Sequence, residues 1–130
     1  RILSSAASDV YKRQDYTISS KISIPLASAA GLILRSQGLK RYYSLELTSD
    51  KKLKINKMEY ELKTLKQIDF DLEFFKDYNL KFKVKGNHLQ GFVDDNLMIE
   101  VEDNENSFEQ GMIGFITENG AIQSESISIE

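Results

Sequence analysis

Polar and apolar side chains alternate with a period of two along most of this chain, and this pattern limits the possible folds more than any other feature. The clearest example is residues 78–85, where four apolar or aromatic side chains alternate with one asparagine and three lysines. Successive side chains of a strand point to opposite faces of a sheet, so the alternation predicts half-buried β-strands. Strands are expected at residues 16–24, 31–35, 42–47, 53–55, 62–65, 78–85, 88–94, 97–102, 111–117 and 121–129.

Short turn signals separate these strands, and no segment has the periodicity of an amphipathic helix. Turns are expected at Gln37-Gly38, Ser49-Asp50, Gly86-Asn87 and Asp95-Asn96. Residues 70–75 fit neither pattern and are expected to form a loop that packs aromatic rings over one end of the fold. Nine or ten short strands joined by Gly, Asn and Asp turns predict an all-β protein, an antiparallel β-sandwich.

The register of one predicted hairpin stays open. A two-residue turn at Asp95-Asn96 would place Phe92 opposite Ile99. A turn shifted by one residue would instead pair Phe92 with Leu97 or Met98. Because a shift of one residue moves a side chain to the other face of the sheet, the pattern does not decide whether Phe92 is core or surface.

The composition excludes several classes of function. A chain of 130 residues is one domain at most. It has no cysteine, which excludes disulfides, zinc–thiolate sites and a cysteine nucleophile, and its single histidine, His88, excludes a multi-histidine metal centre. No apolar run approaches the roughly 18 residues of a membrane helix, and no basic run suggests nucleic acid, so neither is expected as a partner. The compartment stays open, although the lack of cysteine is compatible with the cytoplasm.

Residues 1–14 have neither helical nor strand periodicity, and they lack the apolar centre of a signal peptide. From residue 4 they read SSAASDVYKRQ, which resembles a translated sequencing adapter at the end of a metagenomic reading frame. We therefore expect a non-native leader over residues 1–14 and a sandwich domain over residues 15–130 that is incomplete at its N-terminus. That domain carries 14 basic and 19 acidic side chains, so it is acidic overall.

Six phrases within residues 15–130 together resemble a known family of β-sandwiches. They are DYTI at 15–18, AGLILR at 30–35, RYYSLEL at 41–47, LKFKVKGN at 80–87, GFVD at 91–94 and GMIGF at 111–115. In this order they resemble the concanavalin A-like, laminin G-like jelly roll of many carbohydrate-binding modules. The phrase GLKRYYSLEL at 38–47 further resembles the β-sandwich that follows the catalytic domain in bacterial ADP-ribosylglycohydrolase-like proteins. The resemblance implies a jelly-roll fold and an accessory role.

The chain departs from that family in two places. Such domains begin with further strands that often contain tryptophan, and this chain has no tryptophan, which agrees with a truncated N-terminus. The family usually has an Asp-Gly turn where this chain has Asp95-Asn96. Because asparagine tolerates a positive φ, the hairpin is expected to be kept.

The acidic residues 100–105 suggest a catalytic alternative. Glucanases of this fold class use paired carboxylates on one strand, and Glu100 and Glu102 do share a face. The glucanase pattern, however, has an aspartate between two glutamates, and Glu102 stands in its place here. We therefore expect a solvated strand face and no catalytic residue in this segment. The alternative is a glycoside hydrolase of the glucanase or keto-disaccharide hydrolase type.

Calcium is the less favoured alternative for the loop that follows. Asp103, Asn104, Glu105 and Asn106 supply oxygen ligands, but not at the spacing of a known calcium loop. No metal site and no other cofactor are expected. The three lysines of residues 81–85 are expected to form a solvated sheet face that blunts edge pairing.

The best candidate for a ligand site involves the strand at 42–47. Tyr42 and Glu46 lie on the face opposite its apolar side chains, and Arg35 lies opposite the leucines of the neighbouring strand, so all three are expected to point outward. An arginine–glutamate pair beside a tyrosine suits sugar hydroxyls, and arginine also binds phosphate. We therefore predict Arg35, Tyr42 and Glu46 as ligand-binding residues, with Arg41 as a weaker candidate. A cross-strand salt bridge beside a surface tyrosine is the non-functional alternative.

Together these features predict a non-catalytic accessory module that binds a carbohydrate or a nucleotide sugar. The module is expected to be linked covalently to an upstream domain, such as a bacterial ADP-ribosylglycohydrolase-like enzyme. A purely structural packing domain without a ligand is the alternative.

Overall fold

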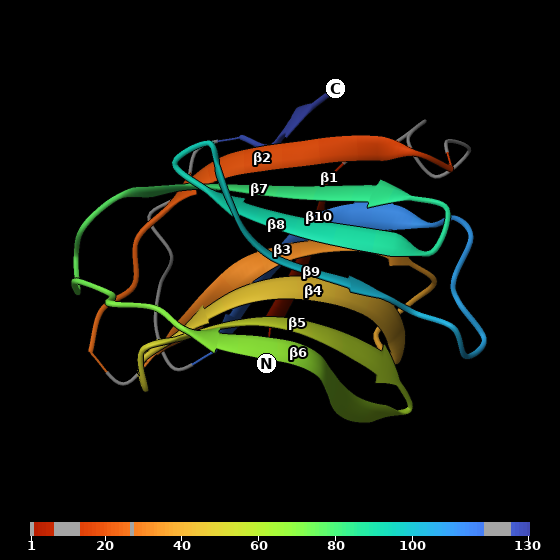
Figure 1. Ribbon diagram of the computed structural model, residues 1–130, viewed down its shortest axis with the longest axis horizontal. Helices are drawn as coiled ribbons and strands as arrows, with labels where there is room; N and C mark the ends of the chain where they lie inside the picture. The colour runs from red at the N-terminus through yellow and green to blue at the C-terminus, as the bar shows by residue number, and fades with distance from the viewer. Residues whose placement is uncertain (1, 7–13, 27, 119–125) are drawn as a thin grey trace.

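The computed structural model describes residues 2–6, 14–26, 28–118 and 126–130, which form two antiparallel sheets packed face to face (Figure 1). The six-stranded sheet has the order β1 (Ile2–Ala6), β10 (Met112–Glu118), β3 (Ala29–Ser36), β4 (Arg41–Thr48), β5 (Lys52–Glu59) and β6 (Glu61–Asp69). The five-stranded sheet has the order β11 (Ser128–Ile129), β2 (Tyr16–Ile22), β7 (Tyr78–Lys85), β8 (His88–Val93) and β9 (Asn96–Glu102). The predicted antiparallel jelly-roll sandwich is confirmed. Among the described residues, no helix is long and apolar enough to cross a membrane.

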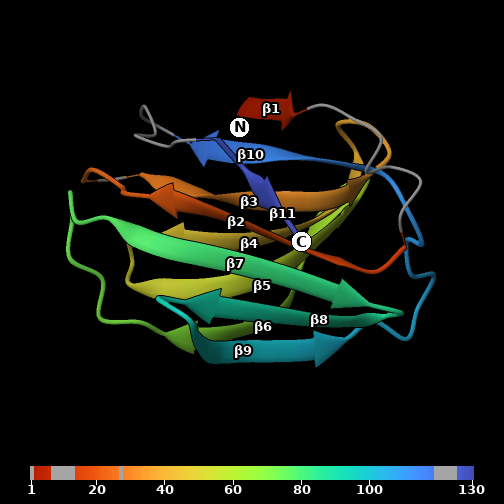
Figure 2. The same ribbon diagram turned by 90° about the horizontal axis from the view of Figure 1, so that it is seen from above.

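The core lies between the two sheets, as the alternation predicted. From above, the five-stranded sheet covers the six-stranded one (Figure 2). The apolar side chains of β7 are buried and its lysines are partly or fully exposed. Leu45 on β4 and Phe82 on β7 are fully buried in the same cluster. Burying one such side chain contributes about 1.5–3 kcal/mol, which is why the inward face tolerates so few polar groups.

The register that the sequence left open is settled by a bulge in the β8–β9 hairpin. Phe92 pairs with Leu97, and the ladder shifts between Gly91 and Phe92. The two turn residues are therefore Asp94 and Asp95, with φ of 49° and 68°, rather than Asp95-Asn96. Two positive φ values define a type I′ turn, which matches the twist of the strands. Phe92 lies on the outward face and is half-buried.

Gly91 faces the core at this bulge, and because it has no side chain it leaves room for a side chain of the opposite sheet. A Cβ atom there would lie 2.6 Å from Leu45 Cδ1 and 2.7 Å from Ile99 Cγ2. Since these distances are well inside van der Waals contact, the leucine of β4 occupies the space that a side chain on β8 would need.

The structure refines the sequence expectations for two strands, one loop and one row of lysines. The strands expected at 53–55 and 62–65 are longer, at Lys52–Glu59 and Glu61–Asp69, because Tyr60 alone, with a φ of 66°, turns β5 into β6. The loop predicted at residues 70–75 extends to residue 77, and its Phe70 ring packs edge-on against Tyr78 of β7 at 5.3 Å. The lysines of residues 81–85 do not lie at an edge, because β7 pairs with β2 on one side and β8 on the other.

The two ends of the chain are described only in part. Residues 2–6, within the expected leader, form β1 and pair antiparallel with β10, so this segment adds a strand that its pattern did not indicate. The interpretation of residues 1–14 as a translated adapter stays a prediction. Of the strand expected at 121–129, residues 121–125 lie outside the described residues, and 128–129 form β11 against β2.

Several connections gather at one end of the sandwich, on the right in Figure 1. They are the residues before β2, the β3–β4 turn, Tyr60 between β5 and β6, the Gly86-Asn87 turn between β7 and β8, and the β9–β10 loop of residues 103–111. We call this the loop end. Binding residues occur disproportionately on loops that a rigid scaffold positions, so the loop end is the expected place for a binding site.

Candidate ligand-binding site

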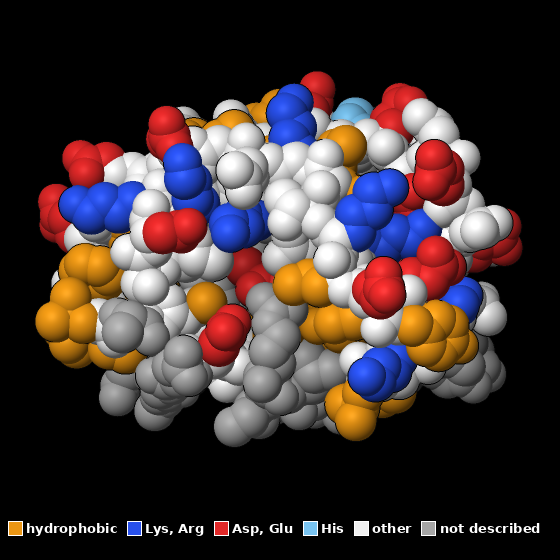
Figure 3. All heavy atoms as spheres, turned by 90° about the horizontal axis from the view of Figure 1, so that it is seen from below, with side chains coloured by type: hydrophobic (Ala, Val, Ile, Leu, Met, Phe, Trp, Pro, Cys, Tyr) orange, Lys and Arg blue, Asp and Glu red, His pale blue; other side chains and the backbone are white. Residues whose placement is uncertain are grey.

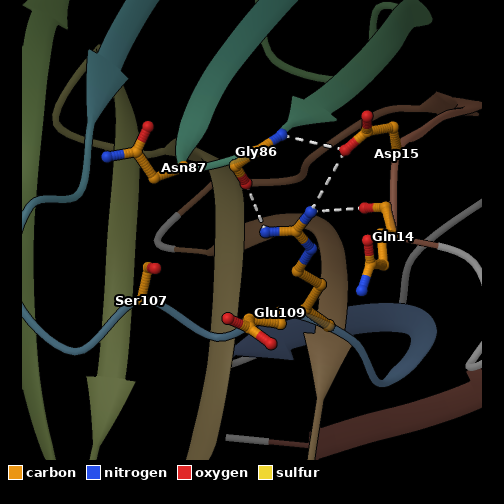
Figure 4. Close-up of a pocket in the computed structure, with 7 residues that line it drawn as sticks. Gln14, Asp15, Gly86, Asn87, Ser107 and Glu109 are labelled. Atoms are coloured by element: carbon orange, nitrogen blue, oxygen red, sulfur yellow. Dashed lines mark hydrogen bonds and ion pairs between the residues drawn. The ribbon is translucent and has the colours of Figure 1, made fainter.

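The loop end contains a polar cleft of about 260 Å³, which we call the Arg35 cleft. It is lined by Gln14, Asp15, Arg35, Gly86, Asn87, Ser107 and Glu109. Figure 4 shows that these residues come from the segment before β2, the end of β3, the β7–β8 turn and the β9–β10 loop. The cleft therefore depends on contacts between parts of the chain that are far apart in sequence.

Arg35 forms the floor of this cleft and ties its walls together. Its side chain is only 2% exposed. One terminal nitrogen, Nη1, donates to the carbonyl oxygens of Gly86 (2.5 Å) and Phe108 (2.7 Å), and Nη2 donates to the carbonyl oxygen of Gln14. Nη2 also lies 3.6 Å from an oxygen of Asp15. Arg35 thus joins three loops, and we assign it a positioning role.

The charge of Arg35 is held inside the protein. Burial lowers the pKa of Arg35, and the nearby Tyr16, Tyr43, Asp15 and Glu109 oppose this shift. Guanidinium groups stay protonated in proteins, so the cleft has a fixed positive charge beneath it. Because carbonyl groups and Asp15 surround that charge, little of it faces the solvent.

The rim of the cleft consists mainly of hydrogen-bond acceptors. Asp15 accepts a hydrogen bond from the Gly86 amide at 2.9 Å through Oδ1, and its side chain is 56% exposed. Glu109 is exposed at the bottom of the view in Figure 4, and Asn87 and Ser107, at the left of the same view, are half-buried. Carboxylate, amide and hydroxyl oxygens that line one cleft suit a ligand with several hydroxyl donors.

A buried polar network fixes the β9–β10 loop beside the cleft. Asp103 accepts hydrogen bonds from the Tyr43 hydroxyl (2.5 Å) and from Lys57 Nζ (2.7 Å). The Tyr43 hydroxyl in turn accepts a hydrogen bond from the Phe108 amide at 3.0 Å, and the two aromatic rings lie 5.0 Å apart. Lys57 also donates to the Glu105 carbonyl. The loop is therefore anchored to β4 and β5 at several points.

The pKa shifts in this network follow from burial and pairing. Burial raises the pKa of Tyr43, and its hydrogen bond to Asp103 raises it further. Burial alone would also raise the pKa of Asp103, but the hydrogen bonds from Lys57 and Tyr43 outweigh it and lower that pKa. Asp103 is thus held as a carboxylate at neutral pH.

The structure corrects the predicted orientation of Arg35. Its φ of 48° breaks the alternation at the end of β3 and turns the side chain toward the interior of the loop end, not toward the outer sheet face. Arg35 and Glu46 therefore lie on opposite faces, and the expected side-by-side arrangement is wrong. Alternation assumes extended backbone, and a single left-handed residue is enough to reverse a side chain.

Tyr42 and Glu46 do share the outer face of the six-stranded sheet, as expected, but both are only 1% exposed. Glu46 accepts hydrogen bonds from the Ser44 hydroxyl at 2.5 Å and from Asn56 Nδ2 at 3.1 Å. Tyr42 packs in a small apolar cluster that includes Ile33. Their proposed roles in ligand binding stay predictions.

Arg41 is the most exposed of the four predicted residues. It pairs with Glu59 at 3.7 Å and donates from Nε to the Gln37 side chain at 3.2 Å. Its guanidinium lies 4.7 Å from the centre of the Phe108 ring and 6.0 Å from that of Tyr60. Arg41 thus joins the β3–β4 and β5–β6 turns to the anchored loop.

The acidic residues 100–105 separate into two environments. Glu100 and Glu102 are exposed on β9, and Glu100 accepts a hydrogen bond from Gln90 at 3.0 Å. Asp103 is buried and paired with Lys57, so it is engaged by a cation of the protein. In the described parts of the chain, no group of three or more histidine, cysteine, aspartate or glutamate residues is arranged to hold a metal ion.

Sequence reasoning missed most of the residues around the Arg35 cleft. Asp15, Ser107 and Glu109 were not singled out as ligand-binding, and Asn87 was recognised only as part of a turn. They lie up to 94 positions apart, from 15 to 109, and meet only because the strands bring their ends together. A local pattern carries no signal for such a site.

Comparisons with known proteins identify the fold. No family model matches the chain, and no curated protein matches it. The carbohydrate-binding module CBM66 from Bacillus subtilis superposes with a TM-score of 0.81 at 22% identity, over 91% of this chain and 76% of that one. The Caenorhabditis elegans galectin LEC-6 superposes with a TM-score of 0.74 at 12% identity, over 99% and 89% of the two chains. The GH43 protein BlXynB from Bacillus licheniformis gives a TM-score of 0.67 at 14% identity, over 91% of this chain but 28% of that one.

Proposed function

We propose that this chain is a non-catalytic carbohydrate-binding module, and that the Arg35 cleft is its binding site. The observation that carries the proposal is the rim of the cleft, where acceptor groups from three connections converge above a buried arginine. The jelly-roll fold, shared with a carbohydrate-binding module and galectins, supports the same class of ligand. A cleft of about 260 Å³ suits one sugar residue more than a large ligand.

The charge distribution favours a neutral sugar over a nucleotide sugar. A diphosphate needs exposed cations or free amide donors, and among the described residues that line the cleft Arg35 is the one basic residue. Its two terminal nitrogens already donate to three carbonyl groups. Two acidic residues on the rim, Asp15 and Glu109, would repel phosphate. Neutral hydroxyl groups, in contrast, donate well to carboxylates.

The proposal treats the module as an accessory to a larger protein. The jelly roll of the Bacillus licheniformis GH43 protein covers only 28% of its chain, so the fold occurs within longer proteins. An upstream ADP-ribosylglycohydrolase-like enzyme stays a prediction based on the resemblance of residues 38–47. Glu100 and Glu102, the candidates of the hydrolase alternative, lie on β9 and do not line the Arg35 cleft.

Calorimetric titration tests this function directly. The probes are glucose, galactose, mannose, fructose and N-acetylglucosamine, with ADP-ribose as the nucleotide-sugar comparison. We expect one neutral sugar to bind the wild-type chain, and Asp15→Ala and Glu109→Ala each to weaken binding about tenfold or more, because each removes a charged acceptor. Asp71→Ala is the matched control, since Asp71 is a fully exposed carboxylate outside the cleft. Binding that survives both cleft variants, or preferential binding of ADP-ribose, would contradict the proposed site.

A further inference from the structure

The β9–β10 loop separates the Arg35 cleft from a second cleft of about 180 Å³ at the same end. We call it the Lys57 cleft; it is lined by Lys57, Glu59, Glu61, Lys63, Asp103, Glu105 and Asn106. Glu105 and Asn106 of the loop face this cleft, while Ser107 and Glu109 face the other. Residues 105–109 of the loop therefore form a wall that the two clefts share.

The floor of the Lys57 cleft is closed, and its rim is open. Lys57 and Asp103 are buried and paired with each other. Lys63 and Glu105 approach one another to 3.8 Å across the opening, and both are exposed. The groups that a ligand would reach are therefore the rim carboxylates, the rim amine and the Asn106 side chain.

An exposed aromatic residue lies in the chain between two residues that line this cleft. Tyr60 is 65% exposed and lies between Glu59 and Glu61, which both line the cleft. The φ of 66° at Tyr60 is unfavourable for an aromatic residue, and the hydrogen bond from its amide to the Lys40 carbonyl, at 2.8 Å, holds the turn. The Arg41 guanidinium lies 6.0 Å from the ring centre. The ring is therefore presented to solvent by a fixed turn.

From this arrangement we propose that Tyr60 and the Lys57 cleft form a second sugar subsite, so that the module binds an extended glycan across the β9–β10 loop. This inference rests on the proposed function of the Arg35 cleft. An exposed tyrosine offers a rigid apolar face for the CH groups of a sugar ring, and the neighbouring polar cleft offers partners for its hydroxyl groups. The shared wall makes the two subsites adjacent.

A second exposed aromatic residue of the same chain provides a control for substitutions of Tyr60. Figure 3 shows apolar side chains exposed at both ends of the face of the six-stranded sheet. Phe75, in the loop before β7, matches Tyr60 closely: it is 70% exposed and has a φ of 63°. No cleft that we describe is lined by Phe75 or by its sequence neighbours. Phe75→Ala therefore controls for the loss of an exposed ring from a left-handed position.

The experiment compares the affinity of each variant for the monosaccharide that binds best and for its linear tetrasaccharide, by calorimetric titration. We expect the wild-type chain and Phe75→Ala to bind the tetrasaccharide about tenfold more tightly than the monosaccharide. Tyr60→Ala should lose that gain but keep the monosaccharide affinity, and Tyr60→Phe should retain the gain. Tyr60→Asn repeats the test with a residue that tolerates a positive φ, in case the alanine variant is unstable.

The possible outcomes distinguish a failure of the second subsite from a failure of the proposed function. If no probe sugar binds the wild-type chain, the proposed function fails, and the second subsite with it. If the monosaccharide binds but the tetrasaccharide binds no better, the module has one subsite and the inference is wrong. An unchanged gain in both Tyr60→Ala and Tyr60→Asn would overturn it as well, while leaving the Arg35 cleft in place.

Discussion

The ion pair between Lys57 and Asp103 is buried, and replacing Lys57 by methionine should destabilise the fold strongly at neutral pH. Both side chains are about 5% exposed, and their charged atoms are 2.7 Å apart. Methionine keeps most of the volume of lysine but leaves the Asp103 carboxylate without its cation. Removing one partner of a buried pair costs about 3–5 kcal/mol, because the remaining charge is uncompensated.

That cost can be converted into a shift of the melting temperature. The unfolding entropy of a 130-residue domain is about 0.27 kcal/mol per kelvin, so the midpoint should fall by about 11–18 °C. Urea denaturation followed by circular dichroism gives the free energy of unfolding, and an unchanged m-value would show that the folded state is otherwise intact. Lys63→Met is the control, because Lys63 is exposed and its ion pair with Glu105 should contribute less than about 1 kcal/mol.

The pH dependence distinguishes a charge effect from a packing defect. In the wild-type chain the pKa of Asp103 is lowered, so its contribution to stability is present at neutral pH and is lost only as the pH falls through that lowered value. In Lys57→Met, burial is no longer balanced by lysine, and we expect the pKa of Asp103 in the folded state to rise above its unfolded value. A raised folded pKa means that stability increases as the pH falls, so the penalty should shrink between pH 7 and pH 5. A penalty below about 1 kcal/mol, or one that is the same at both pH values, would refute this reasoning.

Two further predictions concern the loop end and the hairpin. Arg35→Lys should lower the free energy of unfolding by about 2–3 kcal/mol and abolish sugar binding in the calorimetric assay. The reason is that one ammonium group cannot donate to all three carbonyl groups that Arg35 joins. Full sugar affinity in this variant would contradict the positioning role of Arg35. Asp95→Gly should raise the free energy of unfolding by about 0.5 kcal/mol in the urea assay, because glycine adopts the φ of 68° at that position of the type I′ turn more easily than aspartate. The ion pair of Asp95 with Lys81 is exposed, so its loss should cost little. A clear destabilisation would argue against the turn at Asp94-Asp95.

The fold could be predicted from the sequence because its signals are local. Period-two alternation places the core residues of β7 without knowledge of any other strand, and the Gly86-Asn87 turn follows from two adjacent residues. Tyr60 was missed as a turn because no glycine or proline marks it, and its left-handed backbone is held by a hydrogen bond from its amide to Lys40. The register of the β8–β9 hairpin also depends on a partner elsewhere, the Leu45 side chain that fills the space beside Gly91.

The candidate site was predicted less well, for a related physical reason. Tyr42 and Glu46 were placed on the correct face from alternation alone, but their burial depends on neighbours that a single strand does not reveal. Arg35 was selected as a functional side chain and lines the cleft, although its direction was predicted wrongly because one positive φ reverses it. Asp15 and Glu109 meet only through long-range contacts, which a pattern read along one segment does not contain.

The anchoring of the β9–β10 loop has a consequence for how ligand preference can change. Asp103 and Phe108 insert into the protein: Tyr43 and Lys57 bind the Asp103 carboxylate, and Tyr43 and Arg35 hold the amide and the carbonyl group of Phe108. The neighbouring residues 105, 106, 107 and 109 reach the clefts and contribute little to the core. If the proposed function holds, substitutions at 105, 107 and 109 should therefore alter the preferred sugar with little effect on the stability of the scaffold, whereas Asn106 has a φ of 50° that most other residues disfavour. The loop is suited to diversification as a library, with Asp103, Asn106 and Phe108 kept fixed, in the way that a binding protein is matured toward a new target.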